Sequence, residues 1–310
     1  MIELKRAEGM RPKINICGKD GLLEGRVVRI ARLDAEGFDY VGDPLEALAA
    51  LRKSRTRADL FTFTQQLSDP SPKYDYPMEW DNLAALPITT FDNWMASQID
   101  YKTRNKVRKS AKNGVTVREV PFDMEFVRGI SAIYNETPVR QGKPFWHYQK
   151  DFESVRKMNE SFLDRTIFLG AYLEGELIGF VKLVANEDNS QAGLMQIVSM
   201  IRHRDKAPTN ALVAQAVRSC SERGIPFLWY ANFDYGQKKS DGLAEFKRHN
   251  GFQKVEVPRY YVPLTLIGRI GLKLGLHRKL IDLIPEPIAV RYRDLRSRWY
   301  AKAVPQTSSN

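Results

Sequence analysis

The chain has 310 residues, of which 43% are hydrophobic and 27% charged, and its formal net charge is +11. This composition is typical of a globular protein with one large or two moderate domains, and no run of about 18 apolar residues predicts a membrane span. The charged opening stretch and the two cysteines, Cys17 and Cys220, favour a cytoplasmic protein without an export signal, a disulfide framework or a structural zinc site.

The first 98 residues predict an irregular α/β region. The expected elements are β-rich pieces at 13–17 and 25–33, a helix at 43–54 and a further piece at 58–67. Three prolines and several turn formers predict a loop at 68–80. Helices are expected from Thr90, which can cap the first, and from Asp100, with Gly114 ending the second.

A regular alternation of strands and helices begins at Val115. The expected order is a strand at 115–120, helices at 123–136 and 149–162, a hairpin at 165–186, a strand at 193–201, a helix at 211–222, a strand at 225–233, a helix at 240–250 and a strand at 252–264. Glu174 and Gly175 form the expected hairpin turn. A helix that joins two parallel strands requires a crossover, so the predicted sheet is mixed.

Two segments concentrate the positive charge. The stretch 101–118 has seven Lys or Arg and no acid, and 266–302 has nine basic and three acidic residues. Charge at this density fits an anionic partner, which can be nucleic acid, a phosphorylated cofactor or an acidic lipid surface. A solvated helix face explains each segment equally well.

Three stretches together resemble the GNAT acyltransferase fold, and within it the FemAB-like group of peptidoglycan bridge formers. They are RNKVRKSAKNGVTVRE at 104–119, FLGAYLEGELIGFVKLV at 168–184 and GLAEFKRHNGF at 242–252. The resemblance covers about 99–263 and is weak before that. It implies an α/β (α+β) fold with a GNAT-like mixed sheet flanked by helices.

The domain organisation expected from this resemblance has three parts. Residues 1–98 form an N-terminal α/β region, interpreted as a reduced second GNAT-like unit. Residues 99–265 form the acyltransferase domain. Residues 266–310 form basic amphipathic helices and a tail, which suit either an anionic bilayer or packing on the sheet.

The resemblance also implies a donor cleft where the strands at 193–201 and 225–233 part. The residues expected to bind the donor are Ile197, Val198, Met200, Arg204, Lys206, Thr209 and Asn210. The phosphate loop departs from the family pattern, because Ala207 and Thr209 replace its glycines and Pro208 has no amide to donate. Side chains of the loop would then bind phosphate at the N-terminus of the next helix, near Ala211, although Thr209 or Asn210 can simply be its cap.

Acyl transfer to an amine needs a deprotonated amine, donors for the developing oxyanion and a proton for the departing group. The sequence has no Gly-x-Ser-x-Gly elbow, which favours direct transfer. In FemAB-like proteins the lysine of a Phe-Lys pair is thought to face the donor, and this pair corresponds to Phe246 and Lys247. The helical pattern predicts that Phe246 is buried and that Lys247 lies at the cleft edge; an ordinary solvated lysine is the alternative.

Further candidates follow the strand at 225–233. Asp234 and Tyr235 are expected to relay a proton, although Asp234 can equally be a turn residue. Tyr230 and Asn232 alternate on one side of the strand and are expected to line the cleft for substrate.

The loop at 135–148 is the predicted acceptor site. Arg140 suits a carboxylate or phosphate, and Trp146 and Tyr148 suit stacking or hydrogen bonding to substrate. His147 is a candidate base because histidine titrates near neutral pH, with His203 as a second candidate. Aromatic packing at the start of a helix is the alternative explanation.

The sequence therefore predicts an N-acyltransferase that moves an acyl group from acyl-CoA, such as acetyl-CoA, to an amine of a sugar, amino acid or cell-envelope precursor, without a metal. Aminoacyl-tRNA as donor is the second hypothesis. The third is a non-catalytic GNAT-like module that binds an anionic polymer or a membrane. Contact with the inner face of an anionic membrane would make a lipid-linked acceptor plausible.

Overall fold

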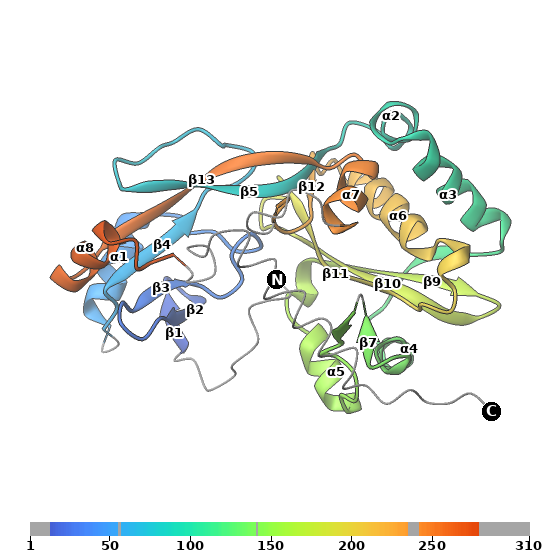
Figure 1. Ribbon diagram of the computed structural model, residues 1–310, viewed down its shortest axis with the longest axis horizontal. Coiled ribbons are helices and arrows are strands. Elements are labelled where there is room, and N and C mark those ends of the chain that lie inside the picture. Colours follow the sequence, from blue (N-terminus) through green and yellow to red (C-terminus); the bar gives the residue numbers. More distant parts are fainter. Residues whose placement is uncertain (1–12, 55–56, 141, 235–241, 279–310) are drawn as a thin grey trace. The chain divides into compact units, whose positions relative to one another are not determined.

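The computed structural model describes residues 13–54, 57–140, 142–234 and 242–278 (Figure 1). These residues divide into two compact units. Unit 1 comprises the described residues up to 100, 184–195 and those from 217 to 278, and unit 2 comprises 101–183 and 196–216. The domain boundary predicted between residues 98 and 99 lies close to the point, between residues 100 and 101, where the chain first passes from unit 1 to unit 2. The predicted domain 99–265 contributes residues to both units.

Unit 1 contains a mixed sheet. Its strands lie in the order β1 (Lys13–Ile16), β2 (Lys19–Glu24), β3 (Ile30–Leu33), β4 (Leu60–Thr64), β13 (Gln253–Pro263), β5 (Met78–Pro87), β12 (Phe227–Trp229) and the first residues of β11 (Ala192–Ser199). The pairs β3/β4 and β11/β12 are parallel, whereas β13 is antiparallel to both of its neighbours. The helical segments are α1 (Pro44–Lys53), α2 (Phe91–Asn93), the π-helix η1 (Trp94–Gln98), α7 (Gly242–His249) and α8 (Leu266–Lys273).

Local sequence explains why α1 forms. The side chain of Asp43 accepts a hydrogen bond from the Leu45 amide, and Pro44 occupies the first helical position, where its missing N–H costs nothing. Ala47, Leu48 and Leu51 then follow at helical spacing and are buried. They pack in one core with Phe61, Phe63 and Tyr260 from β4 and β13. The helix is therefore fixed by its cap and by one apolar face.

The strand β5 corrects the sequence analysis. A loop was predicted through residue 80, but β5 begins at Met78 and pairs with β13 from Met78↔Tyr260 to Ala85↔Gln253. Only Ala84, Ala85 and Leu86 are buried along it, so the strand has no alternating apolar pattern. Pairing with a partner about 170 residues away, rather than local propensity, makes this segment extended. The strand β2 was likewise not predicted.

Unit 2 is built on strands in the order β11, β10 (Glu176–Ala185), β9 (Thr166–Leu173) and β6 (Thr116–Val120). Its helical segments are α3 (Tyr101–Lys112), α4 (Met124–Asn135), α5 (Phe152–Asn159), η2 (Leu163–Arg165), η3 (Arg204–Lys206) and the larger part of α6 (Pro208–Glu222), and β7 (Val139–Arg140) pairs with β8 (Lys143–Pro144). In Figure 1, α3 and α6 lie on one face of these strands and α4 and α5 on the other. The turn between β9 and β10 is formed as predicted, with Glu174 and Gly175 both at positive φ.

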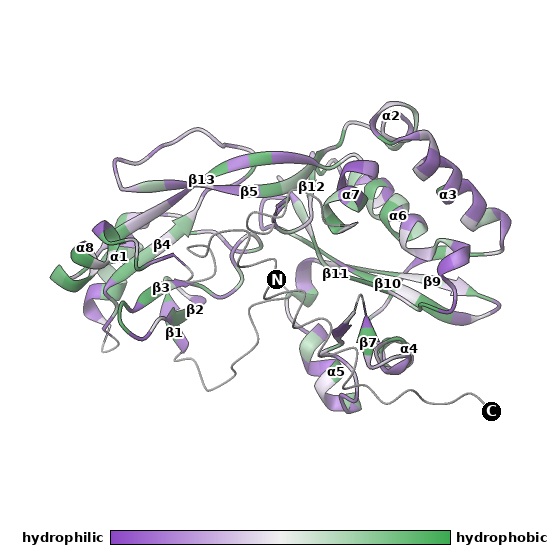
Figure 2. Cartoon of the chain, viewed as in Figure 1, coloured by the Kyte–Doolittle hydropathy of each residue, from purple (hydrophilic) through white to green (hydrophobic). Residues whose placement is uncertain are grey.

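The helix α3 is polar over most of its surface (Figure 2). Thr103 and Ser110 are its buried residues, and most of its lysines and arginines are exposed. Packing therefore uses only a narrow stripe of this helix, and its charged surface stays accessible.

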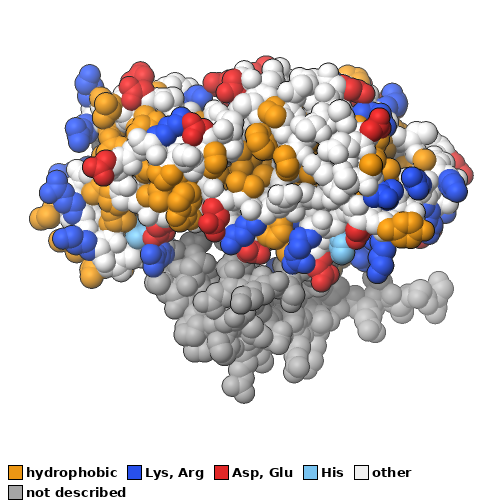
Figure 3. All heavy atoms as spheres, turned by 90° about the horizontal axis from the view of Figure 1, so that it is seen from above, with side chains coloured by type: hydrophobic (Ala, Val, Ile, Leu, Met, Phe, Trp, Pro, Cys, Tyr) orange, Lys and Arg blue, Asp and Glu red, His pale blue; other side chains and the backbone are white. Residues whose placement is uncertain are grey.

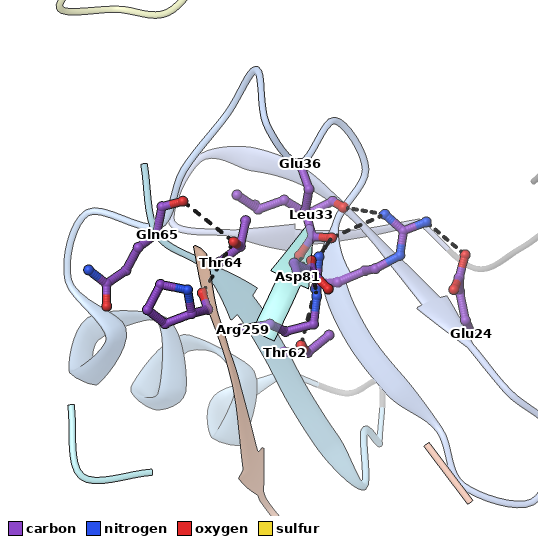
Figure 4. Close-up of polar contacts among 10 residues, drawn as sticks. Glu24, Leu33, Glu36, Thr62, Thr64, Gln65, Asp81 and Arg259 are labelled. Atoms are coloured by element: carbon purple, nitrogen blue, oxygen red, sulfur yellow. Dashed lines mark hydrogen bonds and ion pairs between the residues drawn. The ribbon is translucent and has the colours of Figure 1, made fainter. Parts of the chain in front are cut away.

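A cluster of ion pairs ties the strands of unit 1 together (Figure 4). Arg259 on β13 donates through both Nη atoms to the Glu36 carboxylate, at 3.0 Å each, and through Nε to Asp81 Oδ2 at 2.7 Å. Arg32 on β3 donates to Glu24 Oε1 at 2.8 Å. Buried charges are tolerated when each is paired and hydrogen-bonded, as here. This cluster holds β13 and β5 in register, and their ends support the candidate site.

Candidate functional site

Lys247 is buried in unit 1. On α7 the residues Ala244, Lys247 and the following Asn250 lie at a spacing of three and are 3%, 0% and 0% exposed. Phe246 is only half-buried. The predicted orientation of this helix was therefore wrong by one residue: the face that enters the protein carries the lysine instead of the phenylalanine, and Lys247 is not a solvated side chain.

The ammonium group of Lys247 meets the segment that follows β12. Its Nζ donates a hydrogen bond to the backbone carbonyl of Asn232 and lies 5.0 Å from the centroid of the Tyr230 ring. An ammonium out of water requires such partners, and an aromatic face adds a favourable electrostatic contact. Tyr230 and Asn232, both predicted from the sequence to belong to the site, are thus brought to Lys247.

The strand β12, which precedes this segment, pairs with only the first residues of β11. The parallel pairing of β11 with β12 covers Ala192↔Leu228 and Gly193↔Trp229. The next amide, that of Tyr230, donates to the carbonyl of Ala84 on β5 at 2.8 Å. The strand predicted at 225–233 accordingly ends at Trp229.

Glycine is required where this pairing ends. A Cβ on Gly193 would lie 2.5 Å from the ring of Trp229, so any larger residue would push the two strands apart. Beyond the strand, Ala231 has a φ of +50°, a left-handed conformation that L-residues seldom adopt. A non-glycine residue is therefore held in an unfavourable conformation next to the carbonyl that accepts from Lys247.

Asp234 is fixed by its backbone. Its amide donates to Asn82 Oδ1 on β5 at 2.7 Å, and its carboxylate lies 3.6 Å from Lys254 Nζ on β13. The structure therefore turns this carboxylate toward another lysine. Tyr235, the other predicted proton-relay residue, lies outside the described residues.

The residues predicted to bind the donor through the end of β11 and the following loop belong to unit 2. Ile197 and Val198 are half-buried on β11, and Met200 is buried, with its amide donating to the Ile178 carbonyl at 2.8 Å. Thr209 Oγ1 lies 2.7 Å from Ser199 Oγ. Thr209 therefore connects the first turn of α6 to the end of β11.

The start of α6 differs from the prediction. The helix begins at Pro208 and not near Ala211, because proline suits the first helical position. Thr209 and Asn210 are thus inside the first turn and are not its caps. Ala207 before it has a φ of +55°.

Most backbone amides of this loop already have acceptors. The amides of Arg204, Lys206, Ala207, Asn210 and Ala211 donate to carbonyls within the loop, and those of Ile201 and Arg202 donate to the Glu136 carboxylate. The side chain of Arg204 is exposed, whereas Lys206 pairs with Asp205 at 3.3 Å. The loop thus offers a side-chain cation in place of an amide cradle for phosphate.

Glu136 and Arg140 form a clamp on this loop that the sequence analysis missed. Arg140 donates to Glu136 Oε2 at 3.0 Å and to the Ser199 carbonyl at 2.7 Å. Burial lowers the pKa of Arg140, and Glu136 opposes that shift. Arg140 was predicted to bind substrate, but these protein groups already engage its guanidinium. Glu136 and Arg140 are four residues apart, a spacing that favours an ion pair. Their hydrogen bonds to residues 199–202 join segments far apart in the sequence and could not be predicted from it.

The other predicted acceptor residues pack against each other in unit 2. Trp146 Nε1 donates to His147 Nε2 at 3.0 Å, and the His147 ring stacks on Tyr134 with centroids 4.3 Å apart. The lone pair of His147 Nε2 is therefore occupied, which leaves this nitrogen unsuited to accept a proton from substrate. Tyr148 is half-buried, and Trp146 is 39% exposed with Lys150 Nζ over its ring.

The basic helix α3 lies beside η3 in unit 2. Its exposed cations are Lys102, Lys106, Arg108, Lys109 and Lys112, and within the described parts of the chain none of them has a carboxylate partner. Among the same residues no cluster of three or more His, Cys, Asp or Glu side chains is arranged to hold a metal ion, and no helix is long and apolar enough to cross a bilayer.

Comparison with solved structures identifies the fold. FemX superposes with a TM-score of 0.60 at 14% identity, over 83% of this chain and 86% of FemX. The C-terminal domain of a putative lysylphosphatidylglycerol synthetase from Agrobacterium fabrum gives 0.54 at 14% identity, over 86% and 88% of the two chains. L-PGS from Bacillus licheniformis gives 0.54 at 14%, over 85% and 88%.

These similarities confirm the predicted GNAT-like fold of FemAB-like type. No protein-family model matches the sequence, and a search of curated proteins finds no match.

Proposed function

We propose that this chain is an acyltransferase that moves an aminoacyl group by direct transfer from an ester donor to an amine, with Lys247 as the oxyanion-stabilising residue. The observation that carries the proposal is the burial of Lys247 against the Asn232 carbonyl and the Tyr230 ring. Burying an ammonium group is costly, and a cation held in a dry site stabilises developing negative charge far better than one in water. Lys247 also occupies the lysine position of the Phe-Lys pair that the resemblance to FemAB-like proteins implies.

The reaction conserves atoms and charge without an oxidant or a metal. The amine nitrogen attacks the ester carbonyl carbon, and the carbonyl oxygen becomes an oxyanion near the Lys247 ammonium. The ester C–O bond then breaks, an amide forms, and the proton lost by the amine ends on the departing oxygen. Asp234 is our candidate to carry that proton.

Two features favour aminoacyl-tRNA over acyl-CoA as donor. The loop after β11 has few unengaged amides for a pyrophosphate, and α3 presents five exposed cations without carboxylate partners among the described residues. Such a helix fits the phosphates of a nucleic acid. The putative lysylphosphatidylglycerol synthetase of similar fold, whose name specifies an aminoacylated product, supports an aminoacyl cargo.

Acyl-CoA remains the alternative donor because Arg204, the cation of the family's phosphate-loop pattern, is present and exposed. The acceptor we propose is an amine of a sugar, an amino acid or a lipid-linked cell-envelope precursor.

Thermal unfolding separates the two donors. A ligand that binds the native state raises the unfolding temperature. We expect stabilisation by aminoacylated tRNA and none by acetyl-CoA or longer acyl-CoAs. Stabilisation by acyl-CoA that is lost in Arg204→Ala would instead support the alternative donor.

The role of Lys247 is tested by single-turnover transfer from a mixture of charged tRNAs carrying labelled amino acids to a panel of amines. Lys247→Met keeps the side-chain volume but removes the charge, and it should slow transfer by about 10²-fold or more while tRNA affinity stays unchanged. Arg248→Met, at an exposed position on the same helix, is the matched control and should behave as wild type. Transfer at the wild-type rate by Lys247→Met would refute the proposed role.

A further inference from the structure

The helix α8 directs its small residues toward the rest of unit 1 and its large apolar residues toward solvent. Gly268 and Gly271 are buried, and an added Cβ would lie 1.9 Å from the Asp59 carbonyl oxygen at the first and 2.5 Å from Val28 at the second. A helix that completes a hydrophobic core has the reverse arrangement, with its large apolar side chains inside. Packing of α8 on unit 1 therefore does not account for its leucines and isoleucines.

The exposed apolar side chains form one surface that includes the loop between β2 and β3. Leu266, Ile267, Ile270, Leu274 and Leu276 are 70%, 57%, 50%, 67% and 48% exposed, and Val27 is 77% exposed. Val27 belongs to this surface because its neighbour Val28 packs against Gly271. Figure 2 shows the hydrophobic character of α8. Exposed apolar residues are common singly, but a contiguous group indicates a binding surface.

Cations are interspersed with these apolar residues. Arg26, Arg269 and Lys273 are exposed, and among the described residues none of them has a carboxylate partner. The chain has no acid between 257 and 281. On the side of Figure 3 where α8 lies, basic and apolar side chains likewise alternate.

The carboxylates that contact this region are engaged in holding the helix. Asp59 accepts from the Thr265 hydroxyl at 2.7 Å and from the Arg29 amide at 2.9 Å. Glu79 lies 2.9 Å from His277 Nε2 and accepts from Arg278 Nε at 2.9 Å. The residues on either side of α8 are therefore held to the rest of unit 1 by these carboxylates. The surface of the helix that faces solvent remains apolar and positively charged.

We propose that this surface, formed by Arg26, Val27, Leu266, Ile267, Arg269, Ile270, Lys273 and Leu274, docks on an anionic lipid bilayer. Separate protruding apolar side chains surrounded by cations suit a helix that lies in the headgroup region, where the former enter the acyl boundary and the latter meet anionic lipid. A protein partner would need a groove of matching shape and acidic groups in fixed positions, whereas a bilayer provides both kinds of contact without any such match. The inference does not depend on the transfer reaction. It adds a location for the protein, at the surface of an anionic membrane.

Co-sedimentation of the full chain with vesicles tests the proposal. We expect binding to vesicles of phosphatidylcholine and phosphatidylglycerol in equal parts, and much weaker binding to phosphatidylcholine alone. The double variant Ile267→Gln, Ile270→Gln should bind the mixed vesicles roughly tenfold or more weakly, because two half-exposed side chains no longer enter the lipid. Met124→Gln, Leu163→Gln is the matched control, since these side chains of unit 2 are 49% and 48% exposed, and it should bind as wild type.

The charge contribution is measured separately. Arg269→Gln, Lys273→Gln should weaken binding to the mixed vesicles by roughly tenfold or more and leave the weak binding to phosphatidylcholine unchanged. Equal binding by wild type and the Ile267→Gln, Ile270→Gln variant would overturn the proposal. So would loss of self-association by that variant in sedimentation velocity, if its vesicle binding were unaffected, because the surface would then be a protein interface.

The same variant keeps this inference distinct from the proposed function. In the absence of vesicles, Ile267→Gln, Ile270→Gln should transfer from charged tRNA to a soluble amine at the wild-type rate. A chain that binds vesicles but has no transferase activity would refute the proposed function and leave the docking surface standing.

Discussion

Two lysine side chains, Lys182 and Lys247, are fully buried among the described residues, one in each unit. Lys182 lies on β10 and donates to the Asn159 carbonyl and to Ser161 Oγ, at 2.8 Å each. Both acceptors are neutral, and burial lowers the pKa of Lys182 to about 8 from its ordinary 10.5. Its charge thus costs stability wherever the side chain is protonated.

Because burying the protonated Lys182 side chain costs stability, the difference in free energy of unfolding between wild type and Lys182→Met should depend on pH. The folded-state pKa lies below that of the unfolded chain, so the unfolded state binds more protons between about pH 8 and 10.5, and the contribution of Lys182 to stability rises through that window. The free energy of unfolding of Lys182→Met relative to wild type should therefore fall by up to about 3 kcal/mol between pH 7 and pH 10.5. Urea unfolding at several pH values measures it.

Lys157→Met is the control for this experiment, since Lys157 is an exposed lysine on α5. Its stability difference from wild type should stay constant with pH. A constant difference for Lys182→Met as well would mean that Lys182 titrates in the folded chain as it does in the unfolded chain.

At the scale of single elements, the features that could be predicted from the sequence were those that depend on neighbouring residues. The cap Thr90 and the turn at Glu174 and Gly175 form as predicted, because each depends on a few neighbouring residues. The helix predicted from residue 123 also begins there, with Asp123 as its cap. The strand β5 and the face that α7 buries depend on partners far along the chain, so hydrophobic periodicity did not show them. For the same reason Lys247 was identified as a candidate through the Phe-Lys resemblance, but its burial was not foreseen.

The start of α6 predicts opposite effects for two alanine-to-glycine substitutions four residues apart. Ala207 has a φ of +55°, which costs an L-residue about 1–2 kcal/mol, whereas Ala211 lies in the helix. After the entropy that glycine loses on folding, Ala207→Gly should stabilise the chain by about 0.5 kcal/mol. Ala211→Gly should destabilise it by up to about 1 kcal/mol. Thermal unfolding of both variants checks the signs, and destabilisation by Ala207→Gly would contradict the left-handed conformation.

For the molecule as a whole, the charge of +11 predicted an anionic partner, and the basic segments 101–118 and 266–302 were the places expected for it. The structure shows which cations of these segments are exposed, on α3 in unit 2 and around α8 in unit 1. The net charge cannot reveal which cations are available to a partner, because their availability depends on which of them are paired with carboxylates. Arg140 and Arg259 were as basic in sequence as Lys106, but Glu136, Glu36 and Asp81 neutralise them. Residue types in the candidate site were therefore predictable, whereas the availability of their charges was not.

Salt dependence of tRNA binding follows from the charge on α3. Lys102, Lys106 and Lys109 recur at helical spacing and are exposed. A lysine that contacts a phosphate releases a counterion from the RNA, so each contact adds about one to the slope of log affinity against log salt. The triple variant with glutamine at these positions should weaken binding at low salt and lower that slope by about two to three.

The control must change the net charge equally at sites away from α3. Glutamine in place of Arg128, Lys143 and Lys157, exposed cations of unit 2 on α4, β8 and α5, removes the same three charges, and α4 and α5 lie on the face of the strands opposite α3 (Figure 1). If α3 binds the phosphates directly, this second variant keeps a slope close to that of wild type, because distant charges act only through a screened field. Equal losses in the two variants would show that tRNA responds to the net charge of the chain, and α3 would then lose its assigned role as the nucleic-acid contact.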